Sequence, residues 1–428
     1  MVRDAGIGLL GVGNVGGALI RLLCERAERI ERAASLRLSL VRAAARDAGR
    51  ARPPELPAGA LGFDPFAVVR DPRVTVVVEL LGGLEPAGAL VAEALSLGKP
   101  VVTANKLLLA QRGEELLAEA DRRGVALRFE GAVCGGLPVV RTLRDALAAD
   151  RVLALHGILN GTTNHVLTRM TESGGSFEGA LTEAQAAGYA EADPTLDIEG
   201  HDAAQKLCLL ARLAFGAWVR PADILVEGIE QIGPQDIAGA RELSCVVKLL
   251  AVARRVGGAL DLRVHPAMIP ERGRLASVGG AHNALLIEAE ASGPTLLSGL
   301  GAGGACTAAA VAADILDVAR PGAATPPHVP AAPMALLPRE EIRASYYLRL
   351  TVADAPGVLA SLTAALGRRE ISIAALHQRE RREPVTIVLL THPAREGDVQ
   401  AALAEIDALP TTRAPTQLVR VETDPALR

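Results

Sequence analysis

The sequence contains few aromatic residues, with five Phe, three Tyr and one Trp among 428 residues. Ala, Val, Leu and Gly must therefore fill the core. A chain of this length is expected to form about two or three domains, each with its own hydrophobic core. The five cysteines are scattered and form no C-x-x-C pair. This spacing argues against a disulfide framework and against a zinc site, and it favours the reducing cytoplasm.

An excess of charge of one sign is also missing, since the net charge is −4. We therefore expect no general attraction to nucleic acid or to anionic lipid. The uncharged stretch 296–313 is rich in Gly and Ala and only modestly hydrophobic. A packed loop and helix is predicted there, and no membrane span is expected. The apolar N-terminus contains Asn14 and Arg21, so we interpret it as a buried first strand and not as a signal peptide.

A glycine-rich turn follows the first apolar run, residues 6–10. Gly11, Gly13 and Gly16 spell G-x-G-x-x-G, and a predicted helix comes directly after them. The first glycine permits a tight turn, the second lets a pyrophosphate approach the backbone, and the third allows the helix to pack closely on the strand. The helix N-terminus then faces the phosphates. The residues expected at a dinucleotide cofactor are Gly11, Gly13, Asn14, Val15 and Gly16.

The end of the second predicted strand, 36–44, indicates which nicotinamide cofactor fits. An acidic residue at this point usually holds the ribose 2′-OH of NAD(H). Here Arg46 stands at this point and Asp47 follows it. Because arginine suits a 2′-phosphate, NADP(H) is favoured, and Asp47 leaves NAD(H) open as well.

Strands and helices continue to alternate up to residue 150. Residues 74–80 (VTVVVEL) form a nearly continuous β-branched run, which is typical of a strand buried on both faces of a parallel sheet. Another short strand is predicted over residues 100–102, and Thr103 and Lys106 follow it. The alternation predicts a doubly wound α/β domain.

The segment 184–206 concentrates ionisable groups between two apolar flanks, and helical periodicity begins after Gly200. Asp202 and Lys206 are four residues apart, so they share one face of the predicted helix. A lysine held beside a carboxylate can deliver a proton to a developing alkoxide. The alternative is a surface ion pair ahead of a core helix, which would contribute little.

The same segment resembles the signature of homoserine dehydrogenases. The pattern is A-x-x-x-G, an aromatic and a small residue, two further residues, D-P-x-x-D, an apolar residue and x-G-x-D-x-x-x-K. The matching residues are Ala184, Gly188, Tyr189, Asp193, Pro194, Asp197, Ile198, Gly200, Asp202 and Lys206. The resemblance runs through nearly the whole chain. It implies NADPH-dependent, reversible reduction of L-aspartate 4-semialdehyde to L-homoserine, in threonine, methionine and isoleucine biosynthesis.

The resemblance also implies roles for single residues. Lys206 would donate the proton and Asp202 would position it, although Lys106 stays open as the proton donor. The α-ammonium of the substrate would bind Glu191 and Asp197, with Thr162 as a further substrate contact. The residues implied near the nicotinamide or closing over the cofactor are Thr103, Lys106, Gly188 and Gly303. In the turn 130–137, a monovalent cation, usually sodium, would bind the backbone carbonyls of Glu130, Val133, Gly135 and Leu137.

The chain ends in a segment with its own pattern. A proline-rich stretch predicts a linker, and the elements after it follow the order β-α-β-β-α-β of the ferredoxin-like split. The text D-x-P-G-V-L, from Asp354 to Leu359, resembles an ACT domain. The resemblance implies that the domain binds a small amino acid and that threonine acts through it as a feedback inhibitor. The alternative is a domain kept only for dimerisation.

The expected organisation has four parts. They are a Rossmann-like nucleotide domain over 1–150, completed by about 303–320, an α+β catalytic and dimerisation domain with an open sheet over 151–302, a linker over 321–343 and an ACT domain over 344–428. We expect a homodimer or a homotetramer.

Two other functions stay open. One is a dehydrogenase for another amino-acid aldehyde or keto acid, although the Glu191–Asp197 pair requires a cationic group on the substrate. The other is an amino-acid sensor with a relict nucleotide fold, against which intact Lys106, Asp202 and Lys206 argue.

Overall fold

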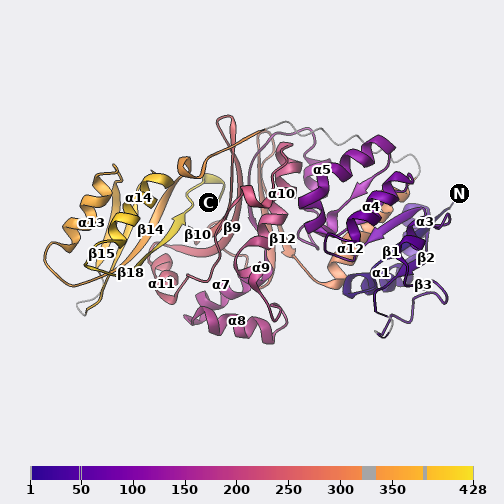
Figure 1. The fold of residues 1–428 in the computed structure, drawn as a ribbon, viewed down its shortest axis with the longest axis horizontal. Helices are drawn as coiled ribbons and strands as arrows, with labels where there is room; N and C mark the ends of the chain where they lie inside the picture. Colours follow the sequence, from indigo (N-terminus) through magenta and orange to yellow (C-terminus); the bar gives the residue numbers. More distant parts are fainter. Residues whose placement is uncertain (1, 48, 50, 321–333, 379–382, 428) are drawn as a thin grey trace. The chain divides into compact units, whose positions relative to one another are not determined.

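The structure is a computed structural model that describes residues 2–47, 49, 51–320, 334–378 and 383–427 (Figure 1). It divides into two compact units. The first comprises residues 1–152, 205–223 and 297–333, and the second comprises residues 153–204, 224–296 and 334–428. The predicted linker 321–343 lies outside the described residues up to residue 333. Within the described residues, no helix has both the length and the apolar character that a bilayer crossing needs.

A six-stranded sheet in the order β3-β2-β1-β4-β5-β6 organises the first unit. Every neighbouring pair in it is parallel. The strand order reverses at β1, which is the doubly wound arrangement, so a ligand crevice is expected outside the carboxyl ends of β1 and β4. The strands are β1 Arg3–Leu10, β2 Leu36–Ala44, β3 Leu61–Gly62, β4 Val76–Glu79, β5 Val101–Thr103 and β6 Leu127–Arg128. The predicted nucleotide-binding fold is thereby confirmed.

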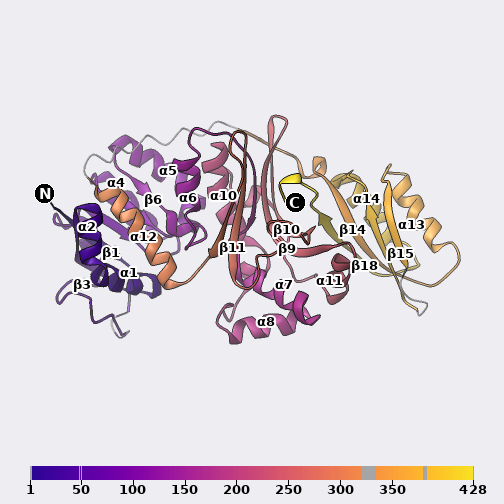
Figure 2. The same ribbon diagram turned by 180° about the vertical axis from the view of Figure 1, so that it is seen from behind.

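Small aliphatic side chains form the core of this unit. Helix α12 (Gly304–Ala319) packs on α1 (Asn14–Glu25) (Figure 2). Their buried residues join those of β1 in a cluster that contains only Ala, Ile, Leu and Val. The other helices are α2 Ala27–Ala34, α3 Pro65–Arg70, α4 Ala87–Ser96, α5 Lys106–Arg123 and α6 Val139–Arg141, with the single turns η1 Glu130–Ala132 and η2 Thr142–Ala146. Close packing of small residues thus replaces the missing aromatic side chains.

The stretch 296–313, predicted as a loop and a helix, begins differently in the structure. Its first residues belong to β12 (Gly293–Leu300), in which half-buried and exposed residues alternate. Alternation with period two is the signature of a strand that has one face covered. A loop and the first part of α12 follow, as predicted.

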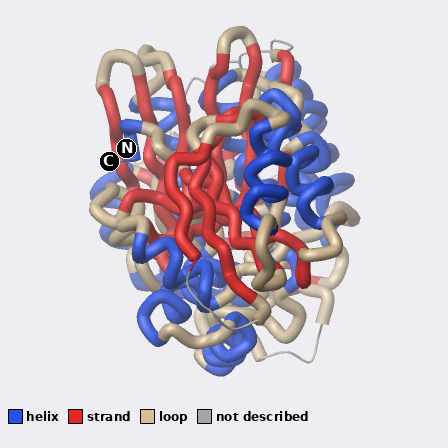
Figure 3. The backbone as a smooth tube through the Cα atoms, turned by 90° about the vertical axis from the view of Figure 1, so that its left-hand side faces the viewer, coloured by secondary structure: helices blue, strands red, loops and turns tan. Residues whose placement is uncertain are grey.

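The second unit contains one mixed sheet with the path β12-β11-β7-β9-β10-β18-β14-β16-β15. Strands β13 and β8 pair with β10, and β17 pairs with β14. Figure 3 draws all strands in red. The strands are β7 Val152–Ile158, β8 Leu225–Val226, β9 Cys245–Val256, β10 Ala259–Pro270, β11 His282–Ala289, β13 Ala335–Leu336, β14 Arg343–Val352, β15 Ile373–Gln378, β16 Val385–Thr391, β17 Ala394–Arg395 and β18 Thr412–Val421.

Residues 153–204 and 224–296 of the second unit are called the catalytic half, and residues 334–428 the ACT or C-terminal half, after the domains predicted from the sequence. Helices also lie between β7 and β9 in the sequence, and their parts within residues 205–223 belong to the first unit. They are α7 Gly161–Ser173, α8 Phe177–Ala186, α9 Thr195–Ile198, α10 His201–Phe215 and α11 Pro234–Glu242, with the turn η3 Pro221–Asp223. The C-terminal half has α13 Val358–Gly367 and α14 Glu396–Asp407, with the turns η4 Arg339–Glu341 and η5 Pro425–Leu427. The order β14-α13-β15-β16-α14-β18 confirms the predicted ferredoxin-like split.

The C-terminal strand also belongs to the catalytic half. Strand β18 pairs in parallel with β10. After β18, the side chains of Ala426 and Leu427 fill a core cluster with residues of β7, β9, β10 and β11. The backbone N–H of Arg274 donates to the carbonyl oxygen of Leu427 at 3.1 Å. The ACT half is therefore joined to the catalytic half by the sheet and by a shared core.

A buried lysine fixes helix α7 against the sheet. The Lys248 ammonium donates to the Asn164 side-chain oxygen at 3.0 Å and to the Val278 carbonyl at 2.7 Å. The Asn164 amide nitrogen lies 3.0–3.1 Å from the carbonyl oxygens of Val278, Gly280 and His282. Burial lowers the pKa of Lys248 to about 8. The hydrogen bonds of the ammonium therefore offset only part of the free-energy cost of burying its charge.

We predict that Lys248 makes stability depend on pH in the alkaline range. Its pKa is about 8 in the folded protein and 10.5 in the unfolded chain. Between these values the unfolded chain binds more protons, so the free energy of unfolding should rise with pH. The unfolding free energy of the wild type minus that of Lys248→Met should increase by about 3 kcal/mol between pH 8 and 10.5. Urea unfolding across this range measures it, and a constant difference would contradict the assignment.

Candidate active site

A cavity of about 440 Å³ opens beside the glycine-rich turn in the first unit. It lies at the carboxyl ends of β1, β2 and β4, where the doubly wound topology predicts a ligand. The residues that line it are Gly11, Val12, Gly13, Ala44, Ala45, Arg46, Asp47, Arg52, Phe63, Pro65, Leu80, Leu81, Gly82, Glu85 and Pro86. Gly11, Gly13 and Arg46 from the sequence analysis are among them, and Asn14 and Val15 form the first turn of α1.

Each glycine of the turn meets a different steric requirement. A Cβ atom on Gly11 would lie 2.6 Å from the carbonyl oxygen of Leu80, and φ at Gly11 is +101°. A Cβ atom on Gly16 would lie 2.1 Å from the carbonyl oxygen of Gly11, whereas nothing lies within 4 Å of the Cβ position at Gly13. The space beside Gly13, together with a helix N-terminus that no side chain caps, fits a pyrophosphate group.

Two arginines near the cavity have different tasks. The Arg52 guanidinium donates to the carbonyl oxygen of Val12 at 2.7 Å and also to that of Asp47, so it braces the glycine turn against the loop after β2. The Asp47 carboxylate accepts the N–H of Gly49 at 2.8 Å. Arg46 lines the cavity. The side chain suited to a 2′-phosphate is therefore Arg46.

A buried carboxylate at the end of β4 organises the neighbouring loop. Glu79 is fully buried and accepts the Thr103 hydroxyl at 2.6 Å. It also accepts the N–H groups of Leu81 and Gly82, which line the cavity. Glu79 thus connects β5 to the cofactor crevice, and Lys106 begins α5 three residues after Thr103. The sequence alone could have singled out Glu79, because it is the one charged residue of the otherwise apolar strand β4.

The polar cluster predicted for the substrate is assembled in the second unit. The Asn160 amide nitrogen donates to Asp197 Oδ1 at 2.7 Å and to Asp202 Oδ2 at 2.9 Å. The Thr162 hydroxyl lies 2.9 Å from Asp197 Oδ2 and 2.8 Å from the carbonyl oxygen of Tyr189. Asn160 also caps α7, since its Oδ1 accepts the N–H of Thr163. Asp197, Asp202 and Thr162 are therefore brought together, and Asn160 is the group that joins them.

The other predicted site residues lie on the following elements. Asp202 stands in the first turn of α10 and Lys206 one turn later. Both side chains are 8% exposed, so both charges are held away from bulk water. Glu191 lies in the exposed segment between α8 and α9, and Gly188 turns the chain there with φ of +75°. Gly303, just before α12, has φ of +126°, a conformation that other residues rarely adopt.

The turn proposed for a cation is built from backbone. Cys134 has φ of +51°, the N–H of Leu137 donates to the carbonyl oxygen of Cys134, and the N–H of Gly136 donates to that of Leu300. The Glu130 carboxylate accepts the N–H groups of Val140 and Arg141, and burial, followed by the nearby Asp314 charge, raises its pKa to about 7. Carbonyl oxygens in such a turn suit a hard cation. No His, Cys, Asp and Glu cluster able to hold a metal exists among the residues that the structure describes.

Comparison with known proteins agrees with this geometry. Three family models match the chain: "Homoserine dehydrogenase, NAD binding domain" over residues 11–130, "Homoserine dehydrogenase" over 138–316 and "ACT domain" over 346–411. A homoserine dehydrogenase of Neisseria gonorrhoeae is 42% identical over 433 residues, covering 98% of this chain and 99% of the relative.

Solved structures agree as well. A homoserine dehydrogenase of Thiobacillus denitrificans has a TM-score of 0.93 and 46% sequence identity, with 98% of each chain covered. A hyperthermophilic archaeal homoserine dehydrogenase in complex with NADPH has a TM-score of 0.63 and 26% identity, covering 74% of this chain and 97% of that one. The chain therefore belongs to the homoserine dehydrogenases, nicotinamide-dependent oxidoreductases that act on a CH–OH group, and it carries an ACT domain at its C-terminus, as the resemblance in the sequence predicted.

Proposed function

We propose that the protein reduces L-aspartate 4-semialdehyde to L-homoserine with NADPH, reversibly, as a step towards threonine, methionine and isoleucine. The observation that carries this proposal is the cluster of Asn160, Thr162, Asp197 and Asp202 at the head of α10, with Lys206 one turn further on. It combines negative charge for an α-ammonium with a lysine able to donate a proton.

In this proposal, Asp197 and Glu191 bind the substrate α-ammonium. The Asp197 carboxylate accepts hydrogen bonds from Asn160 and lies within hydrogen-bond distance of Thr162. These contacts fix the direction of the carboxylate. A substrate without a cationic group would leave this half-buried negative charge without an opposite charge, which disfavours simple aldehydes and keto acids.

Lys206 is the proposed proton donor. When bound, the nicotinamide supplies the hydride that adds to the aldehyde carbon. The carbonyl oxygen then takes a proton from the Lys206 ammonium, and in the reverse direction the amine takes the proton back. The Asp202 carboxylate on the same helix keeps Lys206 charged and oriented. Lys106 remains the second candidate for the proton transfer, and Lys206 is preferred because Asp202 shares its helix face.

NADPH is the proposed cofactor, and NADH is an alternative. The crevice beside Gly11, Gly13, Asn14, Val15 and Gly16 would hold the pyrophosphate, and Arg46 would pair with the 2′-phosphate. Thr103, Lys106, Gly188 and Gly303 would lie towards the nicotinamide end. The NADPH complex of the archaeal relative supports this preference.

Further parts of the proposal concern regulation and assembly. Threonine would bind the ACT domain and inhibit, and sodium would bind the carbonyls of Glu130, Val133, Gly135 and Leu137. We propose the domain limits 1–150 (completed by 303–320), 151–302, 321–343 for the linker and 344–428 for the ACT domain. A homodimer or homotetramer in the cytoplasm completes the proposal; the five cysteines, none of which forms a disulfide, support that location.

Initial rates test the proposed reaction directly. We expect turnover of L-homoserine and of L-aspartate 4-semialdehyde, a lower KM for the NADP(H) form than for the NAD(H) form because Arg46 can pair with the 2′-phosphate, and a lower rate when threonine is added. The assay measures absorbance at the nicotinamide band with each cofactor, with and without threonine. Absence of turnover with both substrates would contradict the enzyme assignment and favour an amino-acid sensor.

Substitution of Lys206 tests its role in proton transfer. Lys206→Ala should lower kcat by at least ~10²-fold, because general acid–base catalysis contributes about that much. The Kd for NADPH, measured by fluorescence, should stay close to that of the wild type. Lys106→Ala, measured in parallel, separates the two candidates. A kcat near the wild-type value in Lys206→Ala, with a large loss in Lys106→Ala, would transfer the role to Lys106.

A further inference from the structure

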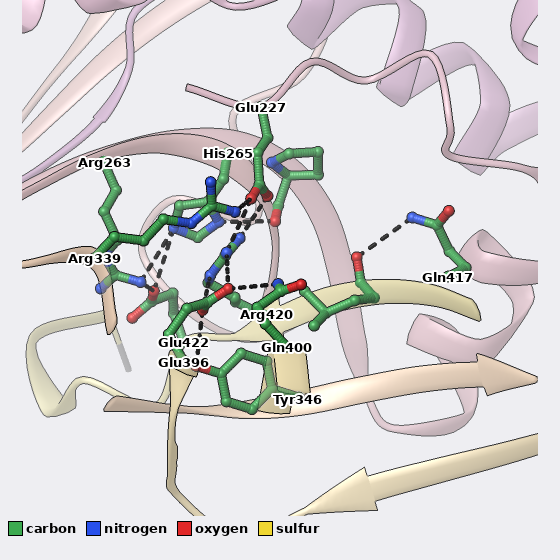
Figure 4. A network of polar contacts seen from close by, with 12 residues as sticks. Glu227, Arg263, His265, Arg339, Tyr346, Glu396, Gln400, Gln417, Arg420 and Glu422 are labelled. Atoms are coloured by element: carbon green, nitrogen blue, oxygen red, sulfur yellow. Dashed lines mark hydrogen bonds and ion pairs between the residues drawn. The ribbon is translucent and has the colours of Figure 1, made fainter. Parts of the chain in front are cut away.

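A buried arginine of the ACT half reaches into the catalytic half. Arg420, on β18, is fully buried. Its guanidinium donates to Glu396 of α14 at 2.7 and 2.9 Å and to Glu227 at 2.5 and 3.0 Å (Figure 4). Tyr346 also donates its hydroxyl to Glu396, at 2.9 Å. Arg420 is thus clamped on one side by its own domain and binds the catalytic half on the other.

Glu227 belongs to a short segment at the edge of the catalytic sheet. The segment begins with β8, which pairs in parallel with β10. The N–H of Glu227 donates to the carbonyl oxygen of Val264 at 2.8 Å. Arg339 adds a contact to the Glu227 carboxylate at 3.2 Å. The backbone at Glu227 is therefore fixed by the sheet, and its side chain is fixed by arginines from the C-terminal half.

The residues after Glu227 pack directly on the turn that follows α9. The N–H of Ile229 donates to the carbonyl oxygen of Ile198 at 2.9 Å. A Cβ atom on Gly228 would lie 2.6 Å from that same oxygen and 2.8 Å from the Cα atom of Glu199. At Gly200, a Cβ atom would lie 3.5 Å from the carbonyl oxygen of Glu227. The backbone of Gly228 and Ile229 touches that of Ile198 and Glu199 directly, and the side chains of Val226 and Val264 pack beside Gly200. A displacement of one segment is therefore transmitted to the other.

This turn connects the two carboxylates of the substrate cluster. Asp197 is in α9, immediately before Ile198, and the N–H of Gly200 donates to the carbonyl oxygen of Asp197 at 3.0 Å. Asp202 follows in the first turn of α10. The position of residues 198–200 therefore sets where both carboxylates meet the Asn160 amide.

We propose that Glu227 is a positioning residue for the substrate: its ion pair with Arg420 holds segment 225–229 against the turn 198–200 and so fixes Asp197 at the substrate ammonium. The proposal rests on the substrate role of Asp197 proposed above. It also gives the ACT half a physical route to the substrate site, since β18 carries the arginine. Any shift of β18 that loosens this pair reaches Asp197 through the contacts between these two segments.

A second ion pair between the same halves provides a matched control. Arg349 of β14 donates to Asp236 of α11 at 2.7 and 3.1 Å, and Asp236 is fully buried. This pair has the same chemistry and joins the same halves of the chain. Asp236 caps the start of α11 by accepting the N–H of Gly233, and no hydrogen bond found in the described residues connects it to the turn 198–200. A role limited to tethering the ACT half would make the two pairs equivalent.

The test compares Glu227→Gln with Asp236→Asn in the full chain. Each change removes one charge, retains the side-chain shape and leaves one N–H of the facing arginine opposite an amide. Glu227→Gln should raise the KM for L-homoserine about tenfold, less than the ~10²-fold cost of a full ångström of misplacement, with the KM for NADP unchanged. Asp236→Asn should leave both KM values unchanged. Glu227→Asp, which keeps the charge, should recover part of the loss. Thermal unfolding confirms that each variant is folded at the assay temperature.

Two results would overturn the proposal. One is an equal effect of Glu227→Gln and Asp236→Asn on the KM for homoserine; the other is a rise in the KM for NADP as large as that for homoserine. If Glu227→Gln does not fold, Arg420→Lys, which keeps the charge but loses the two-pronged contact, decides by the same criteria. The variant Asp197→Asn tests the substrate role of Asp197 separately. An unchanged KM for homoserine in that variant refutes this role, whatever the result for Glu227.

Discussion

One amide group holds together the two carboxylates of the proposed substrate site. Asp197 and Asp202 carry like charges, which repel each other and would separate in a mobile site. Asn160 donates to one oxygen of each, and the same side chain caps α7 through its oxygen. Helix α7 is in turn fixed to the sheet, because Asn164 hydrogen-bonds the buried Lys248. The geometry of the site is therefore set by an asparagine whose partners come from three different elements.

The network around Arg420 has a different energetic character. Burying charges costs several kcal/mol for each ion, and pairing often does no more than offset that cost. Burial opposes the charged form of Arg420, yet the contacts with Glu227 and Glu396 raise its pKa above the usual value. Glu422 lies two residues after Arg420 in the sequence. Arg263 and other nearby basic groups lower the pKa of Glu422 to about 2, although its burial acts in the opposite direction. Apolar residues could fill this space at lower cost, so the network is better explained by the geometry that it enforces between β10, β18 and segment 225–229.

Sequence reasoning succeeded where the signal is local and failed where the partner is distant. The glycine turn, the Asp202–Lys206 spacing and the ferredoxin-like order each lie within a short stretch, and helix or strand periodicity reveals them. The contact of Arg420 with Glu227 spans 193 residues, and that of Asp314 with the backbone of Glu130 spans 184. Nothing near Glu227 in the sequence separates it from an exposed acid. The roles of the site residues likewise came from a family resemblance, not from their spacing.

The joint between the two halves is the basis of the route proposed above from the ACT half to the substrate cluster. An appended domain on a flexible tether changes nothing at a distance unless a two-state element connects the sites. Here β18 pairs with β10, Leu427 packs in the catalytic core, and the Arg420–Glu227 contact leads on to the turn beside Asp197. The first two fix the register of the joint. Of the three, the ion pair depends most on side-chain geometry, which a small shift of β18 can change. It is therefore the contact through which the proposed coupling would run.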